Sequence, residues 1–206
     1  MSAVEAFRKL ILVVEKFERC EKLQLTEPLA KNHIEDLEKQ FGFQLPSELR
    51  DIYSLHDGES EDSAGLFFGM HFLPLREAYD QFKFGMLMAK THSSDAAIAT
   101  LGGFGSTPDQ TVQAKHFVDR RIPFATDYSG NYIAIDQIPG EKGIQGQVIG
   151  FDHEKRSPFY QLSNSLTEFL EFTLRQYELG RGHPEHSADG SSGSQMEDIF
   201  GFRDGN

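Results

Sequence analysis

The chain has 206 residues, with 20 Lys and Arg against 32 Asp and Glu, which gives a formal net charge of −12. This length is sufficient for a sizeable hydrophobic core in one or two domains. The charge argues against direct nucleic-acid binding, which needs clustered Lys and Arg to neutralise phosphates. It suits a soluble protein, or one with a basic partner. With 18 Phe and no Trp, the core is expected to be rich in phenylalanine.

The compartment follows from cysteine usage and hydropathy. Cys20 is the single cysteine, so an intramolecular disulfide is excluded and a reducing compartment is favoured. No run approaches the roughly 20 apolar residues of a membrane span, and the N-terminus lacks the pattern of a signal peptide. We therefore expect a cytoplasmic protein that does not contact membranes.

Helices are predicted in the first quarter of the chain. The first should run from Ser2 to about Lys22, because its apolar residues recur at helical spacing. Thr26 is the expected N-cap of the second, with Pro28 in its first turn. That helix should end at Phe41, where Gly42 can adopt the left-handed conformation.

A corner follows the second helix. Leu45-Pro46 forces extended backbone, because the residue before proline avoids helical geometry. Apolar residues at helical spacing then predict a third helix from Ser47 that ends at Gly58.

The middle of the chain alternates loops with short elements. Residues 59–63 are acidic and polar and should form an exposed loop, whereas residues 65–69 should form a short buried strand. Residues 71–75 are expected to be extended, at the edge of a sheet, and residues 76–84 to be helical. Residues 91–115 combine small residues with paired glycines and are predicted to be an insertion or mobile loop.

Strands dominate the second half. Turn signals at residues 127–131 and 139–143 separate β-branched runs and predict an antiparallel meander. Its strands are Ile122–Ala125, Tyr132–Asp136 and Gln147–Phe151, with Phe159-Tyr160 as a short edge strand. A capping box at Ser165–Glu168 starts a closing helix that ends at Gly180.

This order of helices, then a sheet, then a helix predicts an α+β architecture. We expect one domain over residues 1–180, with its core in residues 27–180. Residues 181–206 should form a disordered acidic tail.

Four signatures carry a resemblance to a known family. They are the corner of Gly42, Leu45, Pro46, Tyr53 and Gly58; Gly65-Leu66-Phe67 followed by Phe72-Leu73-Pro74-Leu75; Ile122-Pro123-Phe124-Ala125-Thr126-Asp127 with Gly130-Asn131-Tyr132 and Ile135-Asp136; and Gly146-Gln147-Val148 running into Phe151-Asp152-His153-Glu154 and the Phe169-Leu170 helix. Together they resemble the SMI1/KNR4 (SUKH) superfamily, and the form of residues 151–154 is similar to its bacterial branch.

The resemblance implies a central, mostly antiparallel sheet flanked by helices, and a protein-binding role. Many bacterial members are immunity proteins that neutralise toxins, often nucleases, whereas fungal relatives regulate cell-wall synthesis and signalling. We therefore expect an immunity protein. A regulatory scaffold of the fungal type is the alternative.

Several carboxylates raise the question of an enzyme. Carboxylates and a histidine suit a divalent cation, and the candidates are Asp127, Asp136, Asp152, His153 and Glu154. However, Asp127 opens a turn, where Asp side chains bond the backbone two residues on, and Asp136 ends a strand. A metal-dependent hydrolase is thus the weaker alternative, and we predict no catalytic residue, metal or cofactor.

The predicted function is recognition of a basic protein, for instance a toxin domain, by a negative surface. The candidate partner-binding residues are Glu59, Glu61, Asp62, Asp127, Tyr128, Asp152 and Glu154. Charge complementarity of this kind mainly accelerates association, so the on-rate should be sensitive to salt. The identity of the partner and the oligomeric state do not follow from the sequence.

Overall fold

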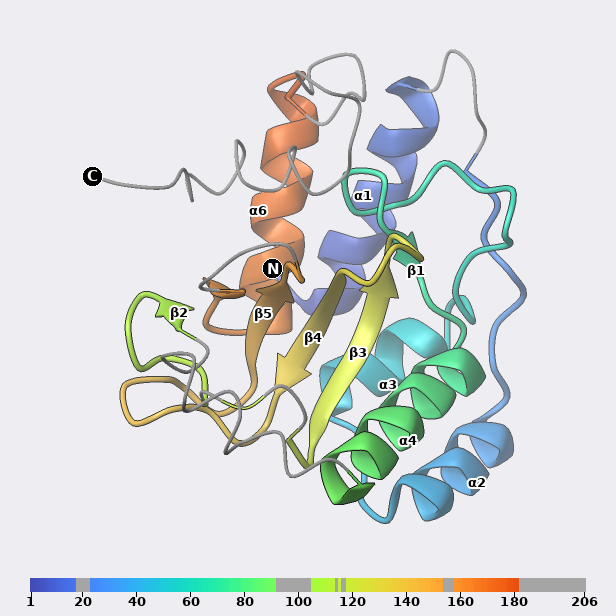
Figure 1. The fold of residues 1–206 in the computed structure, drawn as a ribbon. Coiled ribbons are helices and arrows are strands. Elements are labelled where there is room, and N and C mark those ends of the chain that lie inside the picture. Colours follow the sequence, from blue (N-terminus) through green and yellow to red (C-terminus); the bar gives the residue numbers. More distant parts are fainter. Residues whose placement is uncertain (18–22, 92–104, 114, 116–117, 154–157, 182–206) are drawn as a thin grey trace.

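The computed structural model describes residues 1–17, 23–91, 105–113, 115, 118–153 and 158–181. At its centre is a six-stranded sheet with the order β1-β3-β4-β5-β6-β2 (Figure 1). The strands are β1 His71–Phe72, β2 Ser106–Thr107, β3 Arg121–Thr126, β4 Tyr132–Asp136, β5 Gln147–Phe151 and β6 Phe159–Ser163. All neighbouring strands are antiparallel except β2 and β6, which are parallel.

Helices pack around this sheet in two groups. The helices are α1 Ala3–Phe17, α2 Lys31–Phe41, α3 Ser47–Tyr53, α4 Leu75–Thr91 and α6 Leu166–Glu178. The helices α1, α3 and α6 pack against one another behind the sheet, whereas α4 lies along β3 and contacts α2 (Figure 1). The α+β prediction is confirmed. Among the described residues, no helix is both long enough and apolar enough to cross a membrane.

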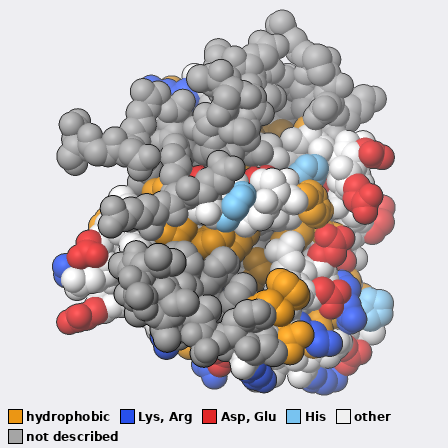
Figure 2. Space-filling model, in the orientation of Figure 1, with side chains coloured by type: hydrophobic (Ala, Val, Ile, Leu, Met, Phe, Trp, Pro, Cys, Tyr) orange, Lys and Arg blue, Asp and Glu red, His pale blue; other side chains and the backbone are white. Residues whose placement is uncertain are grey.

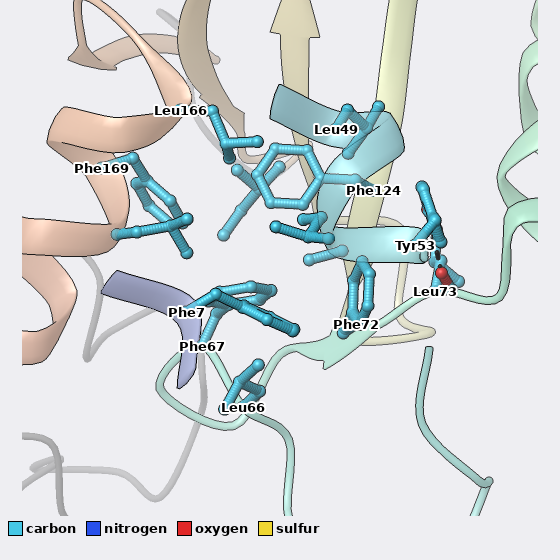
Figure 3. Close-up of a cluster of buried hydrophobic side chains, with 14 of the residues drawn as sticks. Phe7, Leu49, Tyr53, Leu66, Phe67, Phe72, Leu73, Phe124, Leu166 and Phe169 are labelled. Carbon is cyan, nitrogen blue, oxygen red and sulfur yellow. Dashed lines mark hydrogen bonds between the residues drawn. The ribbon is translucent and has the colours of Figure 1, made fainter. Parts of the chain in front are cut away.

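The main core lies between the sheet and α1, α3 and α6, and it is built from aromatic rings. Figure 3 shows Phe67 in one cluster with the strand residue Phe124 and the helix residue Phe169. The Phe67 ring lies 5.7 Å from the Phe124 ring and 5.5 Å from the Phe169 ring, centroid to centroid. Tyr53 is fully buried beside this cluster, and its hydroxyl donates to the carbonyl of Leu73 at 3.0 Å. The phenylalanine-rich composition thus supplies interlocking edge-to-face contacts, which add to the burial of apolar area.

The start of α2 differs from the prediction. The helix begins at Lys31, and Thr26 does not cap it. Instead, the Thr26 hydroxyl donates to the carbonyl of Asp57 at 2.6 Å, and its backbone N–H donates to the carbonyl of Gly58 at 3.0 Å. The Thr26 side chain, which the local sequence predicted as an N-cap, is therefore used in a long-range hydrogen bond instead.

Gly58 has a different role from the one predicted. The helix α3 ends at Tyr53, earlier than expected. Gly58 lies beyond it with φ +84°, and a Cβ there would lie 2.3 Å from the backbone nitrogen of Pro74. Glycine is required at this position because two backbone segments meet there.

Residues 65–69 form a turn, so the predicted strand is wrong. Phe67 and Met70 pair as an isolated bridge, and Phe68 adopts a positive φ of 57°. The side chains of Leu66, Phe67 and Phe68 are nonetheless fully buried, and the Tyr177 hydroxyl accepts a hydrogen bond from the Phe68 N–H at 3.0 Å. A buried apolar run between glycines does not distinguish a strand from a tight turn.

Part of the region predicted as an insertion or mobile loop belongs to the sheet. Residues 92–104 lie outside the described part, but residues 106–107 form β2, and the segment after it packs on the face of the sheet opposite the main core. Val112 is buried there in a small cluster with Ile149 and Phe159. Because β2 pairs with β6, the strand predicted as an edge is an inner one.

Other predictions are confirmed. Gly42 ends α2 with φ 81°, and the Ser165 side chain caps α6 by accepting from the Glu168 N–H at 3.2 Å. The Glu168 carboxylate accepts from the N–H of Asn164 at 3.0 Å, one residue before the partner that a capping box uses. Residues 182–206 lie outside the described residues, so the predicted disordered tail stays a prediction.

Candidate protein-binding surface

The turn between β3 and β4 is organised by Asp127. Its carboxylate accepts hydrogen bonds from the Ser129 N–H at 2.8 Å and hydroxyl at 2.7 Å, and from the Asn131 N–H at 3.1 Å and side-chain amide at 2.8 Å. The predicted structural role of Asp127 is confirmed. With this many partners inside the turn, its carboxylate positions the turn and has little capacity left for a ligand.

Tyr128 is held at the tip of this turn in an unusual conformation. Its φ is 58°, which is uncommon for a bulky residue and costs on the order of 1–3 kcal/mol. Its side chain is 53% exposed, while its ring lies 5.3 Å from the His71 ring and its hydroxyl donates to Glu77 on α4 at 3.4 Å. The turn therefore presents an aromatic side chain at the surface, in a fixed direction.

The surroundings of Tyr128 are acidic. Partial burial, together with the charge of Glu77, raises the Tyr128 pKa to about 12. Partial burial also raises the pKa of Glu77, and the charges of Glu61, Asp57 and Asp80 raise it further, although the bond from Tyr128 opposes this. Figure 2 shows acidic side chains gathered over the α3–β1 loop and the start of α4. Glu61 and Tyr128, both predicted partner residues, thus lie in one acidic region with Glu77, which bonds the Tyr128 hydroxyl. The sequence did not indicate Glu77.

Residues 59–63 were predicted to form an exposed acidic loop, and this prediction is wrong for Glu59, which is buried. It is 3% exposed, and its carboxylate accepts hydrogen bonds from the Ser63 hydroxyl and from the N–H groups of Gly65, Leu66 and Phe72 at 2.5–3.1 Å. It ties the loop to β1 from within and is not available at the surface. Glu61 and Asp62 on the same loop are exposed, as predicted.

The remaining predicted partner residues follow β5. Asp152 is half-buried, and its N–H donates to the carbonyl of Pro158 at 2.8 Å. The next residue, His153, donates its N–H to the Asn131 side-chain oxygen at 3.1 Å, so the end of β5 lies against the Tyr128 turn. Glu154 lies outside the described residues.

A groove lies beside this turn, between α4 and the outer face of β3 and β4. Its volume is about 550 Å³. The residues that line it are Glu77, Asp80, Gln81, Phe82, Phe84, Gly85, Met86, Val118, Arg121, Pro123, Thr126, Tyr128, Gly130, Asn131 and Tyr132. Hydrophobic side chains form a band across this region of the surface in Figure 2.

A bulge in β3 shapes the floor of the groove. The register between β3 and β4 shifts between Pro123 and Ala125, so Phe124 is the additional residue. Proline is tolerated in a strand at such a bulge because its missing N–H breaks no ladder bond. Phe124 enters the core, and Pro123 faces the groove.

The groove was not predicted from the sequence, although one signal for it was present. The prediction ended the helix at residue 84, whereas α4 continues to Thr91. Phe84 at the predicted end of the helix and Leu87 in the additional turns are 59% and 53% exposed. Residues 82–88 contain more apolar side chains than one buried face requires, which indicates a second contact surface.

Asp136 has a structural role. It is fully buried. One carboxylate oxygen accepts from the Ile138 N–H at 3.2 Å, and the other accepts from the Gln147 side-chain amide at 3.3 Å. This second oxygen also lies 4.0 Å from the Arg121 guanidinium. Within the described part of the chain, no three His, Cys, Asp or Glu side chains are grouped so that they could hold a metal ion. Cys20 lies outside it.

Comparison with known proteins identifies the family. Residues 28–171 match the model of the SMI1 / KNR4 family (SUKH-1). The chain belongs to this family. It is 29% identical over 157 residues to the "Cell wall biosynthesis/cell cycle regulator smi1" of Schizosaccharomyces pombe, covering 72% of this chain and 31% of that protein. It is 25% identical over 187 residues to the "Glucan synthesis regulatory protein" of Neurospora crassa, covering 77% of this chain and 35% of that protein.

This SMI1/KNR4 chain therefore matches only part of each fungal relative. A further "KNR4/SMI1 homolog", from Yarrowia lipolytica, is 24% identical over 208 residues, covering 81% of this chain and 29% of that protein. The chain thus spans about a third of the length of these relatives. The match confirms the resemblance to the SMI1/KNR4 superfamily that the sequence signatures indicated, and the bacterial branch stays a prediction.

Proposed function

We propose that this SMI1/KNR4 domain is a non-enzymatic protein-binding module that acts within a cytoplasmic regulatory scaffold. The observation that carries the proposal is its similarity, over most of its length, to fungal proteins named as regulators of cell-wall biosynthesis and glucan synthesis. The immunity interpretation has less support, because two of the three relatives compared are named as regulators and none is named as a toxin antagonist.

The side-chain chemistry supports binding over catalysis. The carboxylates of Asp127 and Asp136 are occupied by hydrogen bonds inside turns, and that of Glu59 by bonds inside the fold. What remains at the surface is an exposed aromatic residue, Tyr128, beside acidic residues and an apolar groove. Aromatic side chains in such settings are common anchors of protein interfaces.

Affinity purification of the full chain from its own cells, with quantitative mass spectrometry, tests the proposal. We expect a complex of several proteins. Recovery of a single small toxin domain would instead support immunity and refute the scaffold function. A purified candidate partner should then bind the chain directly in a pull-down.

The acidic surface adds a kinetic expectation. With a formal net charge of −12, the chain should associate faster with a basic partner at low salt than at high salt, because screening weakens electrostatic steering. Stopped-flow mixing at increasing salt measures this, and an on-rate independent of salt would exclude electrostatic steering. Calorimetry with Mg²⁺, Mn²⁺, Zn²⁺ and Ca²⁺ tests the hydrolase alternative, and we expect no binding.

A further inference from the structure

We infer that the groove between α4 and the β3–β4 hairpin binds a short segment of a partner protein in which a Lys or Arg adjoins a large apolar side chain. This inference rests on the proposed protein-binding function and specifies its surface and the chemistry of its ligand.

The apolar part of the groove selects the apolar side chain. Phe82, Met86 and Pro123 line it together with the Tyr132 ring. Phe84 lies on its α4 side with 59% of its surface exposed. Leu87, about one helical turn further along α4, is also an exposed apolar residue, at 53%. Burying a side chain of the size of leucine or phenylalanine against such a surface is favourable, because it removes apolar area from water.

The acidic part of the groove selects the cation. Glu77 and Asp80 lie three residues apart on α4, so their carboxylates lie on one side of the helix. Tyr128 borders them and holds Glu77 through its hydroxyl. Exposed Glu61 contributes negative potential at both Glu77 and Tyr128.

The groove's own cation does not neutralise this charge. Arg121 is the one Lys or Arg among the described residues that line the groove, and it is 5% exposed. Its guanidinium donates to the carbonyl of Lys115 at 2.9 Å, lies 4.0 Å from Asp136 and covers the Phe159 ring at 4.6 Å. Arg121 is therefore occupied within the fold. Asp80 is paired with Arg76 on the exposed side of α4, which leaves Glu77 as the main site for an incoming cation.

A tryptophan-containing peptide provides a direct assay, because the chain itself contains no Trp. The probe is a short synthetic peptide with Arg-Trp in a Gly-Ser background, and the matched control peptide carries Glu-Trp. When the indole enters the groove, its emission should shift to shorter wavelength. We expect the Arg-Trp peptide to bind the full chain at least about tenfold more tightly than the Glu-Trp peptide.

Paired variants assign the binding to the groove. Glu77→Lys and Phe84→Ser should each weaken the Arg-Trp peptide about tenfold or more. Asp51→Lys and Leu12→Ser make matching changes, acidic to Lys and apolar to Ser, at exposed positions that do not line the groove, and they should leave binding unchanged. All four side chains are exposed or at the surface, so thermal unfolding should confirm intact folds.

The outcomes separate this inference from the proposed function. Equal binding of both peptides, no binding of either, or equal losses in the groove and control variants overturns the groove assignment. If Glu77→Lys and Phe84→Ser chains still purify with the complex that the unmodified chain retains, the protein-binding function stands and the groove is not its surface. If the unmodified chain retains no complex although the peptide binds in the groove, the scaffold function fails and the groove assignment stands.

Discussion

Replacement of Glu59 provides a sharp test of how the α3–β1 loop is held. Its carboxylate accepts hydrogen bonds from the Ser63 hydroxyl and from the buried N–H groups of Gly65, Leu66 and Phe72. Glu59→Ala leaves those three N–H groups without this acceptor in a site where Glu59 itself is 3% exposed. A buried donor left unsatisfied costs about 1–3 kcal/mol.

The net loss is smaller than the sum of these penalties, because the variant no longer buries a charge. We expect the free energy of unfolding to fall by about 3–5 kcal/mol. For a domain of this size, that lowers the midpoint of thermal unfolding by about 6–20 °C. Glu59→Gln keeps one acceptor oxygen but turns an NH₂ group towards the Gly65 N–H, so we expect a loss of about 1–2 kcal/mol.

Urea unfolding followed by circular dichroism measures these changes. Glu61→Ala and Asp62→Ala are matched controls, since both residues are exposed on the same loop, and each should change stability by less than about 0.5 kcal/mol. A loss below about 1 kcal/mol for Glu59→Ala would refute the structural role assigned to this carboxylate.

Four further predictions concern individual positions. Gly42→Ala should cost about 1–2 kcal/mol for its left-handed conformation alone, since a Cβ there meets nothing within 4 Å. Gly58→Ala should cost substantially more in the same urea assay, because its Cβ would lie 2.3 Å from the Pro74 nitrogen. Ser165→Ala should cost about 1 kcal/mol by removing the N-cap of α6. In NMR titration of labelled tyrosine rings, Tyr128 should titrate near its raised pKa of about 12, and Glu77→Gln should lower that pKa towards 10.

The sign of the Tyr128 effect on stability follows from its pKa. The folded state holds the phenolic proton more tightly than the unfolded state, whose tyrosine pKa is about 10. The contribution of Tyr128 to stability is therefore complete below pH 10 and is lost as the pH rises towards 12. A Tyr128 pKa that does not change in Glu77→Gln would contradict the contact between the two side chains.

Equal losses of stability for Gly42→Ala and Gly58→Ala would contradict the close approach of Gly58 to Pro74.

The candidate surface was partly accessible to sequence reasoning. The role of Asp127 was predicted, because an Asp that opens a glycine-containing turn bonds locally to the backbone. The burial of Glu59 was not, because a polar, acidic stretch carries no sign that one carboxylate will turn inward to bind N–H groups as far along the chain as Phe72. The groove was missed because it needs α4 and the bulged β3 side by side, and neither segment has a hollow by itself.

Local chemistry sufficed for much of this fold. Helix α6 with its Ser165 cap, the end of α2 at Gly42 and the β3–β4–β5 meander all follow from short-range spacing, capping and turn residues. The sequence signatures also indicated the family, because several short motifs occur in a fixed order.

Tertiary structure decided the features in which distant segments compete for the same groups. Thr26 does not cap α2 as predicted, because its hydroxyl bonds the segment after α3. Residues 65–69 form a turn in place of the predicted strand, and the Phe68 N–H in this turn donates to the Tyr177 hydroxyl. The acidic surface around Tyr128 likewise forms only when the β3–β4 turn meets Glu77 on α4. The free-energy differences between local conformational propensities are smaller than the free energy that a long-range hydrogen bond or a buried ring contributes. Where local propensity and tertiary packing conflict, packing therefore decides the structure.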